Sequence, residues 1–193
     1  MQMSDKRERF WQLLEPEYVG AMMFCRKLSA DRERGDDLFQ DALLLAYRRI
    51  ETLRDETAFR SWLYRIIINA FRSRTRRPLW RRMVPLTPEI EVSLTSDDPV
   101  AAYAARRWLQ QAFRVLSPHD QALVTLHELH GWPVAELAQL LNTTEGAVKA
   151  RLFRCRSRLK RVLEAGLTAS ARLAASTETI GGKSCAVTKP GSD

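Results

Sequence analysis

The chain has 193 residues, of which 45% are hydrophobic, and it carries a formal net charge of +8 with a pI of about 9.9. This length is enough for one large core or two small ones, and the charge favours a polyanionic partner, either a nucleic acid or an acidic membrane surface. Residues 1–15 are charged throughout, and every apolar run is too short for a signal peptide or a membrane span. The three cysteines are scattered without a CxxC pair, as in proteins of a reducing compartment. We therefore expect a soluble cytoplasmic protein without membrane insertion.

Helical periodicity dominates the chain, and no alternation of apolar and polar residues is long enough to predict a sheet. We predict an all-α fold with two small helical domains, over residues 8–77 and 100–164. The intervening residues 78–99 hold four prolines and change from basic to acidic, which predicts a flexible linker. Residues 165–193 are small and polar with little to bury, and we expect them to be disordered.

The first strong pattern is an amphipathic helix over residues 36–50, DDLFQDALLLAYRRI. Its predicted core face comprises Leu38, Phe39, Ala42 and Leu45. Charged and polar residues make up most of the opposite face, which carries Asp36, Asp37, Gln40, Asp41, Leu44, Tyr47 and Arg48. Leu44 and Tyr47 are apolar among charges, and exposed apolar residues rimmed by charge are typical of a protein-docking surface. Two isolated surface hydrophobics remain an equal alternative on this pattern alone.

Residues 59–77, FRSWLYRIIINAFRSRTRR, form a basic helix that also carries aromatic residues. From Phe59 to Arg82 there are eight arginines and no acidic residue. One side is apolar and comprises Phe59, Leu63, Ile66 and Ala70, while another is polar and comprises Ser61, Arg65, Asn69, Arg72 and Arg76. Trp62 lies at the border, either in the core or exposed. Rings beside a basic stripe are typical of contact with single-stranded or melted nucleic acid, where bases stack on rings and phosphates meet arginine.

The second block contains a predicted helix-turn-helix. Ser117 and Pro118 begin a helix that should end at Gly131, and Pro133 begins a short helix whose buried residues are Val134, Leu137, Ala138 and Leu141. Residues 142–144, Asn-Thr-Thr, make the turn, since Asn accepts a left-handed conformation and Thr can cap the next helix. The following helix should run from about residue 145 to 163.

This last helix has a core side and a basic side. At about 100° per residue, the core side comprises Val148, Leu152, Cys155 and Leu159. The opposite side comprises Gly146, Ala150, Phe153, Arg154 and Ser157, with Lys149 and Arg156 along one edge and Arg151 and Arg158 along the other. Small residues that allow close approach, together with basic flanks, are what a helix in the DNA major groove needs. An ordinary amphipathic helix with a solvated basic face is the alternative, and the preceding helix and turn favour DNA binding.

Catalytic and metal-binding patterns are absent from the sequence. The HELH segment with His127 and His130 is not the HExxH zinc signature, and we interpret both histidines as surface or partly buried side chains. Cys25 lies in an apolar run and is expected in the core. Without a phosphate-cradling glycine loop or a nucleophile elbow, we expect neither an enzyme nor a cofactor.

Taken together, these segments resemble the extracytoplasmic-function (ECF) group of sigma factors in the sigma-70 family, over about residues 10–77 and 102–164. The helix at 36–50 resembles region 2.2, which binds the clamp helices of the polymerase beta-prime subunit. The helix at 59–77 resembles regions 2.3 and 2.4, which melt and read the −10 element. The segment LSPHDQALVTLHELHGWPVAELAQLLNTTEGAVKARLFRCRSRLKR resembles region 4, which reads the −35 element and docks on the polymerase beta flap.

The resemblance implies three sets of contact residues. Polymerase contacts are expected at Asp37, Gln40, Asp41, Leu44 and Arg48. Contacts with the −10 element are expected at Trp62, Arg65, Asn69, Arg72 and Arg76. Contacts with the −35 element are expected at Lys149, Ala150, Arg151, Phe153, Arg154, Arg156 and Arg158. The implied partners are core RNA polymerase, promoter DNA and an anti-sigma factor.

Two other functions fit parts of the chain. A free-standing helix-turn-helix regulator explains the second block but leaves the helix at 59–77 without a role. An RNA-binding adaptor would bind RNA independently of promoter sequence. A mobility-shift assay separates them, because a regulator binds duplex DNA alone whereas a sigma factor binds weakly without core polymerase.

Overall fold

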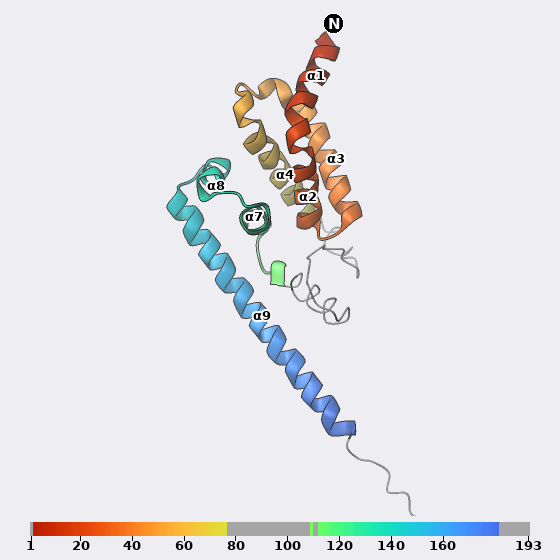
Figure 1. The fold of residues 1–193 in the computed structure, drawn as a ribbon, viewed down its shortest axis with the longest axis vertical. Helices are drawn as coiled ribbons and strands as arrows, with labels where there is room; N and C mark the ends of the chain where they lie inside the picture. Colours follow the sequence, from red (N-terminus) through yellow and green to blue (C-terminus); the bar gives the residue numbers. More distant parts are fainter. Residues whose placement is uncertain (1, 77–108, 110–111, 182–193) are drawn as a thin grey trace, which may run out of the picture.

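The computed structural model describes residues 2–76, 109 and 112–181, and every regular element in these ranges is a helix, which confirms the all-α prediction (Figure 1). The first block contains α1 (Gln2–Leu14), η1 (Glu15–Glu17), α2 (Tyr18–Ser29), α3 (Arg32–Arg49), η2 (Ile50–Thr52), η3 (Glu56–Ala58) and α4 (Phe59–Thr75). The second contains α7 (Pro118–Val124), the π-helical turn η4 (Thr125–Leu129), α8 (Val134–Leu141) and α9 (Glu145–Gly181). The predicted linker at 78–99 and the end of the predicted disordered tail lie outside the described residues.

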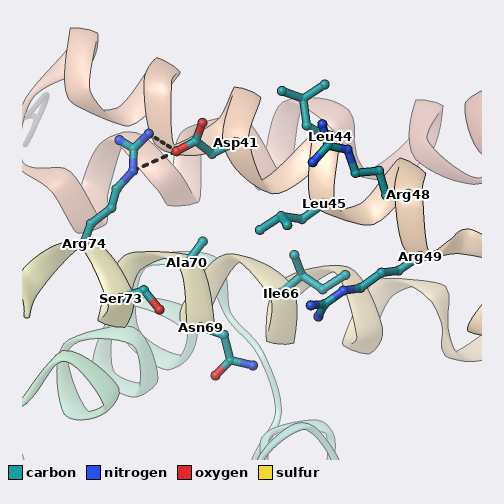
Figure 2. A pocket seen from close by; sticks show the side chains of 10 residues that line it. All are labelled: Asp41, Leu44, Leu45, Arg48, Arg49, Ile66, Asn69, Ala70, Ser73 and Arg74. Carbon is teal, nitrogen blue, oxygen red and sulfur yellow. Dashed lines mark hydrogen bonds and ion pairs between the residues drawn. The ribbon is translucent and has the colours of Figure 1, made fainter.

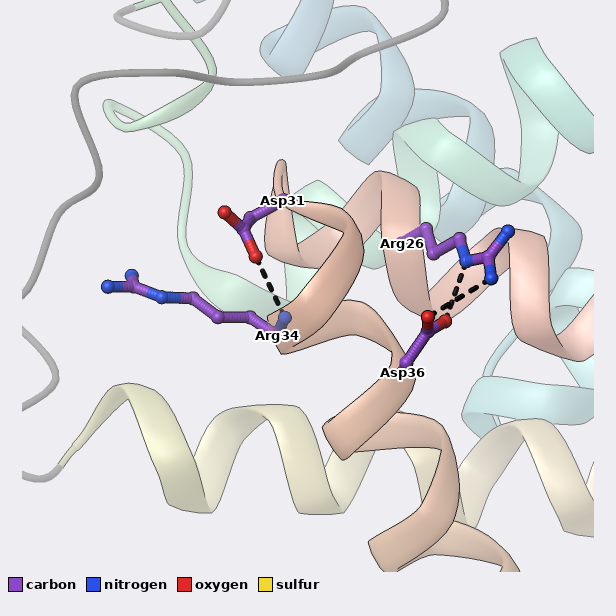
Figure 3. A network of polar contacts seen from close by, with 4 residues as sticks. All are labelled: Arg26, Asp31, Arg34 and Asp36. Carbon is purple, nitrogen blue, oxygen red and sulfur yellow. Dashed lines mark hydrogen bonds and ion pairs between the residues drawn. The ribbon is translucent and has the colours of Figure 1, made fainter.

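Helix α3 begins four residues earlier than its apolar pattern predicts, because Asp31 caps it. The Asp31 carboxylate accepts a hydrogen bond from the Arg34 backbone amide at 2.8 Å (Figure 3), which satisfies one of the free amides of the first turn. Asp36, also near the start of α3, accepts two hydrogen bonds from the Arg26 guanidinium of α2, from Nε at 2.6 Å and from Nη2 at 3.1 Å. This bidentate salt bridge joins α2 to α3.

The two helices cross closely at Gly35. A Cβ atom at this position would lie 2.4 Å from the Arg26 Cα atom and 2.8 Å from its backbone nitrogen. Only glycine therefore fits this crossing, and the hydrogen bond from Gly35 N to Asp31 O at 3.0 Å completes the first turn of α3.

Helix α4 is buried on most of its sides. Its predicted apolar side is buried at Phe59, Leu63 and Ile66 and half-buried at Ala70. A second buried side, absent from the sequence prediction, comprises Tyr64, Ile67, Ile68 and Phe71. A helix that is apolar nearly all round needs cover on most of its circumference, and α4 is in contact with α2, α3, α7 and α8.

The predicted helix-turn-helix is present. The Ser117 hydroxyl accepts from the Asp120 amide at 3.2 Å, and Gly131 has a φ of +67° before Pro133 leads into α8. Asn142 takes the left-handed conformation at a φ of 50°, and the Thr144 hydroxyl accepts from the Ala147 amide at 3.2 Å. In α8, Leu137 and Ala138 are buried as predicted, whereas Val134 and Leu141 are half-buried and Leu140 takes the remaining buried place.

Helix α9 is longer than predicted. It continues past residue 163 to Gly181, into the segment for which the sequence predicts disorder. The segment is rich in alanine, which has the highest helix propensity, and its next proline is Pro190. Helix propensity acts without a buried face, so the lack of buried residues in this segment did not predict the helix.

Candidate nucleic-acid and polymerase interfaces

The predicted docking face of α3 is largely accessible. Leu44 is 57% exposed, and the exposed set also includes Asp37, Gln40, Asp41 and Arg48. Two residues assigned to this face belong elsewhere: Asp36 is paired with Arg26, and Tyr47 is half-buried with its ring 5.4 Å from that of Phe10 on α1. The exposed apolar contribution to this face therefore comes from Leu44 alone.

An open groove of about 400 Å³ lies beside this face, between α3 and α4 (Figure 2). Its floor is apolar, with Leu45, Ile66 and Ala70, and its polar lining residues are Asp41, Arg48, Arg49, Asn69, Ser73 and Arg74. At one end the Arg74 guanidinium donates to the Asp41 carboxylate and, at 3.0 Å, to the Asp37 carbonyl oxygen. The groove thus joins predicted docking residues to a residue of the predicted −10 set, Asn69.

The predicted −10 residues of α4 are only partly accessible. Arg65, Asn69 and Arg76 are exposed, whereas Arg72 and Trp62 are half-buried. The Trp62 ring lies 5.8 Å from the Phe59 ring, which agrees with its predicted border position. The sequence did not predict that two of these arginines contact the second block: Arg65 reaches α8, and Arg72 reaches α7.

The segment between α3 and α4 is held by charged contacts. The Lys6 Nζ atom lies 2.7 Å from Glu51 Oε1, and Arg9 Nε lies 2.6 Å from Glu56 Oε1. Asp55 accepts from both the amide and the hydroxyl of Thr57, at 2.9 and 2.7 Å. These hydrogen bonds hold the pKa of the Asp55 carboxyl below its ordinary value. The segment preceding α4 therefore has a defined shape against α1.

Helix α9 has the predicted phase. Val148, Leu152 and Cys155 are at most 2% exposed, and Leu159 is half-buried against the core. On the opposite side Phe153 is 70% exposed, and the other exposed members of the predicted −35 set are Lys149, Ala150, Arg154, Arg156 and Arg158. An exposed phenylalanine on a basic helix surface can contact an apolar group such as a thymine methyl.

Arg151 differs from this set because it turns toward its own domain. Its Nε atom donates to Asp120 Oδ1 at 2.5 Å, and the Ser117 hydroxyl donates to Asp120 Oδ2 at 2.7 Å. Burial acts to raise the pKa of Asp120, but the hydrogen bonds from Ser117 and Arg151 outweigh it and lower the pKa. Arg151 thus holds α9 against the start of α7.

Among the described residues no group of three or more His, Cys, Asp and Glu side chains could hold a metal ion. His127 and His130 are half-buried, as expected, with His127 Nδ1 2.9 Å from the Trp132 carbonyl oxygen. Cys25 is fully buried, as predicted, and burial raises the pKa of its thiol. No described helix combines the length and the apolarity that crossing a membrane requires.

Comparison with known proteins identifies the family. The family models "Sigma-70 region 2" and "Sigma-70, region 4" match residues 20–82 and 106–159. The ECF RNA polymerase sigma factor SigM of Mycobacterium tuberculosis is 33% identical over 157 residues, which cover 81% of this chain and 78% of the relative. The RNA polymerase sigma-E factor of Streptomyces coelicolor is 31% identical over 143 residues, covering 73% and 78% of the two chains. The chain belongs to the ECF group of sigma-70 family sigma factors.

The fold of this sigma factor also resembles solved structures. The sigma factor RpoE in complex with the anti-sigma factor NepR from Bartonella quintana is 23% identical at a TM-score of 0.59, covering 81% of this chain and 98% of that chain. CnrH in complex with the cytosolic domain of CnrY has the same identity and TM-score, covering 82% and 90%. At this identity the likeness concerns the fold alone.

Membership of the family assigns the two blocks. The region 2 match contains α3 and α4, and the region 4 match contains α7, α8 and the first part of α9. The protein is an ECF RNA polymerase sigma factor that initiates transcription, and it is not an enzyme. Like other sigma factors it binds core RNA polymerase and promoter DNA.

Proposed function

We propose that this sigma factor divides promoter recognition among three helices. The exposed face of α3 binds the clamp helices of the polymerase beta-prime subunit, α4 melts and reads the −10 element, and α9 reads the −35 element while region 4 docks on the beta flap. The observation that carries the proposal is the orientation of α9, because its buried stripe fixes which side chains point away from the domain.

On α9 the residues proposed to contact bases differ from the residues proposed to contact phosphates. Arg154 offers two donors to the acceptor edge of a guanine, Phe153 offers an apolar contact, and Ala150 permits close approach. Arg158 and Arg156 flank this face and meet phosphates. Arg156 pairs with Glu128 at 2.7 Å in the free protein, and this exposed pair is weak enough to exchange for a phosphate.

On α3 the proposed docking contact combines one apolar side chain with charges of both signs. Leu44, at 57% exposed, supplies the apolar contact, and Asp37, Gln40, Asp41 and Arg48 surround it. Such a patch fits a polymerase surface that offers an apolar position and complementary charges.

We also propose that a protein inhibitor of the anti-sigma type binds this chain. Support comes from the two solved structures of similar fold, both of which contain an anti-sigma factor or a partner's cytosolic domain. The groove between α3 and α4 offers such a partner an apolar floor within a charged rim.

The test is transcription in vitro. Core polymerase with this protein, on fragmented DNA of the source genome, should give transcripts whose start sites share one −35 and one −10 sequence at constant spacing. A mobility-shift assay on the selected promoter should show weak binding by the protein alone and strong binding after core polymerase is added. Tight, sequence-specific duplex binding without polymerase, and no transcripts, would support the free-standing regulator instead.

A further inference from the structure

One face of α1 contacts the segment that joins α3 to α4 (Figure 1). Arg9 and Phe10 follow Lys6 by three and four residues, so the three side chains share one side of the helix. Lys6 Nζ lies 2.7 Å from Glu51 Oε1, and Arg9 Nε lies 2.6 Å from Glu56 Oε1. The two charged contacts therefore hold the segment at two points along its length.

The third contact from this face of α1 is buried and leads to α4. The Phe10 ring stands nearly edge-on to the Phe59 ring, with the centroids 6.2 Å apart and the planes at 75°, and both side chains are buried. Phe59 is the first residue of α4, and its ring also lies 5.8 Å from that of Trp62. A row of three rings thus runs from α1 to Trp62, a member of the predicted −10 set.

The orientation of the Trp62 ring depends on what lies beneath it. Trp62 is half-buried, so part of the ring packs on the core and part faces solvent. Stacking on an unpaired base is stronger when the ring is already held in the binding orientation. An exposed ion pair alone contributes little, but here two pairs and one buried ring contact act on the same short segment before α4.

We propose that Lys6, Arg9 and Phe10 are positioning residues for promoter melting. Through them α1 holds the start of α4, and with it the Trp62 ring, in the orientation that stacks on an unpaired base. The inference rests on the proposed −10 role of Trp62. Because the α1 side chains act through Phe59 and Trp62, a change in the ion pairs should alter strand separation without altering the affinity for core polymerase.

Charge reversal of one ion pair tests the proposal in the holoenzyme. Arg9→Glu places two carboxylates where the structure has an ion pair, and their repulsion should displace Glu56 and the start of α4. Permanganate reactivity of unpaired thymines is measured on a promoter selected by transcription in vitro. It should show about fivefold less open complex than with the unaltered protein, while the affinity for core polymerase stays within about twofold.

A charge swap and a matched control identify the ion pair as the cause. The double variant Arg9→Glu with Glu56→Arg restores the pair with opposite polarity and should recover the open complex to within about twofold. Arg7→Glu makes the same change in charge on the same helix, at an exposed side chain that has no hydrogen bond or ion pair among the described residues, and it should melt promoters normally. A swap that fails to restore melting, or an equal loss in Arg7→Glu, would overturn the proposal.

Combination with Trp62→Ala separates this inference from the proposed function. If α1 acts through Trp62, Arg9→Glu should cause no further loss of open complex in the Trp62→Ala protein. The same loss in that background, or normal melting by Arg9→Glu alone, would overturn the positioning role and leave the −10 role of Trp62 intact. Normal melting by folded Trp62→Ala would remove the −10 role, and the positioning role with it.

The second ion pair provides an independent variant. Lys6→Glu should reduce the open complex in the same way, and Glu51→Lys in the same protein should restore it. This pair replaces the first one if Arg9→Glu does not fold. Normal melting by folded Lys6→Glu would show that α1 does not position Trp62 through this contact.

Discussion

The Arg72 guanidinium and the His119 imidazole meet at 2.8 Å across the boundary between region 2 and region 4. A guanidinium can only donate hydrogen bonds, so His119 Nε2 must accept, and the ring must be neutral. Burial lowers the pKa of His119, and the positive charges of Arg72, Arg151 and Arg76 lower it further, against the opposite effect of Asp120. The contact therefore belongs to the unprotonated histidine.

The second interface histidine behaves in the same way. Burial lowers the pKa of His130 to about 4, with Lys27 and Arg60 adding to the effect, and its buried Nε2 has no hydrogen-bond partner among the described residues. Both histidines bind a proton less readily while region 2 and region 4 are in contact than they would if the regions separated. The contact between the two regions is thus most stable above the ordinary histidine pKa near 6.5 and loses stability as the pH falls from 6.5 toward 4.

We predict that acid weakens the contact between region 2 and region 4 in the free protein. Energy transfer between dyes on cysteines at Arg54 and Lys160, with Cys185 replaced by Ser, should fall as the pH is lowered from 7.5 to 5.5. The ratio of protein with the two regions in contact to protein with the regions apart should drop by up to about tenfold per pH unit for each histidine. Glu17 opposes this trend, because burial raises the pKa of its carboxyl above the ordinary value of 4.5, and the folded arrangement gains stability as the pH falls through that raised value.

Histidine variants provide the control for this experiment. The double variant His119→Gln and His130→Gln should lose most of the pH dependence, whereas His127→Gln should keep it, because His127 bonds to Trp132 within region 4. A distance that is constant or shortens on acidification in the unaltered protein would contradict the prediction.

Variants of the exposed face of α3 test whether this helix binds core polymerase. Leu44→Lys should weaken binding to core polymerase by at least about tenfold, since it places a charge in the centre of the apolar contact. Asp41→Arg alone is ambiguous because Asp41 also binds Arg74, so the double variant Asp41→Arg with Arg74→Asp restores the pair between α3 and α4 while keeping the reversed charge on α3. If the swapped protein and Leu44→Lys both bind core polymerase normally, α3 is not the docking helix.

The crossing of α2 and α3 gives a stability prediction. Gly35→Ala should lower the free energy of unfolding by about 3 kcal/mol or more, because the new Cβ meets backbone atoms of Arg26 rather than a flexible side chain. Gly146→Ala is the matched control, since a Cβ there meets nothing within 4 Å, and it should be neutral or stabilising by up to about 1 kcal/mol. Urea unfolding of both proteins measures the difference, and equal midpoints would contradict it.

These residues also show how far sequence reasoning reached. Periodicity predicted the buried stripe of α9 and the exposed Phe153, because one helix with one core has a phase that the sequence displays. It missed the burial of Trp132 and the second buried side of α4, since Tyr64 on that side packs against both Phe24 and Trp132, which lie far away in the sequence. Local patterns carry no information on such packing. Arg151 was placed with the phosphate contacts for a related reason: its partner Asp120 lies 31 positions away.

Trp62 should contribute to promoter melting as well as to the stability of the fold. The ring is half-buried beside Phe59, so Trp62→Ala should cost some stability and also reduce open-complex formation, since stacking offsets the cost of unpaired bases. Trp62→Phe keeps a ring and should restore much of the melting. Permanganate reactivity of unpaired thymines measures the open complex in variants shown to be folded, and normal melting by folded Trp62→Ala would remove the residue from the −10 set.

Two arginines four positions apart on α9 should respond differently to mutation. Arg154 and Arg158 are both exposed, yet Arg154 lies on the proposed reading face, and Arg158 lies at its flank. Arg154→Ala in the holoenzyme should cost about 1–3 kcal/mol of −35 binding and relax the preference at one base pair. Arg158→Ala should weaken binding to all −35 sequences alike and reduce the slope of log affinity against log salt by about one. Binding selections from a randomised −35 library at two salt concentrations measure both quantities. Unchanged base preference in Arg154→Ala together with altered preference in Arg158→Ala would show that α9 enters the groove with a different face.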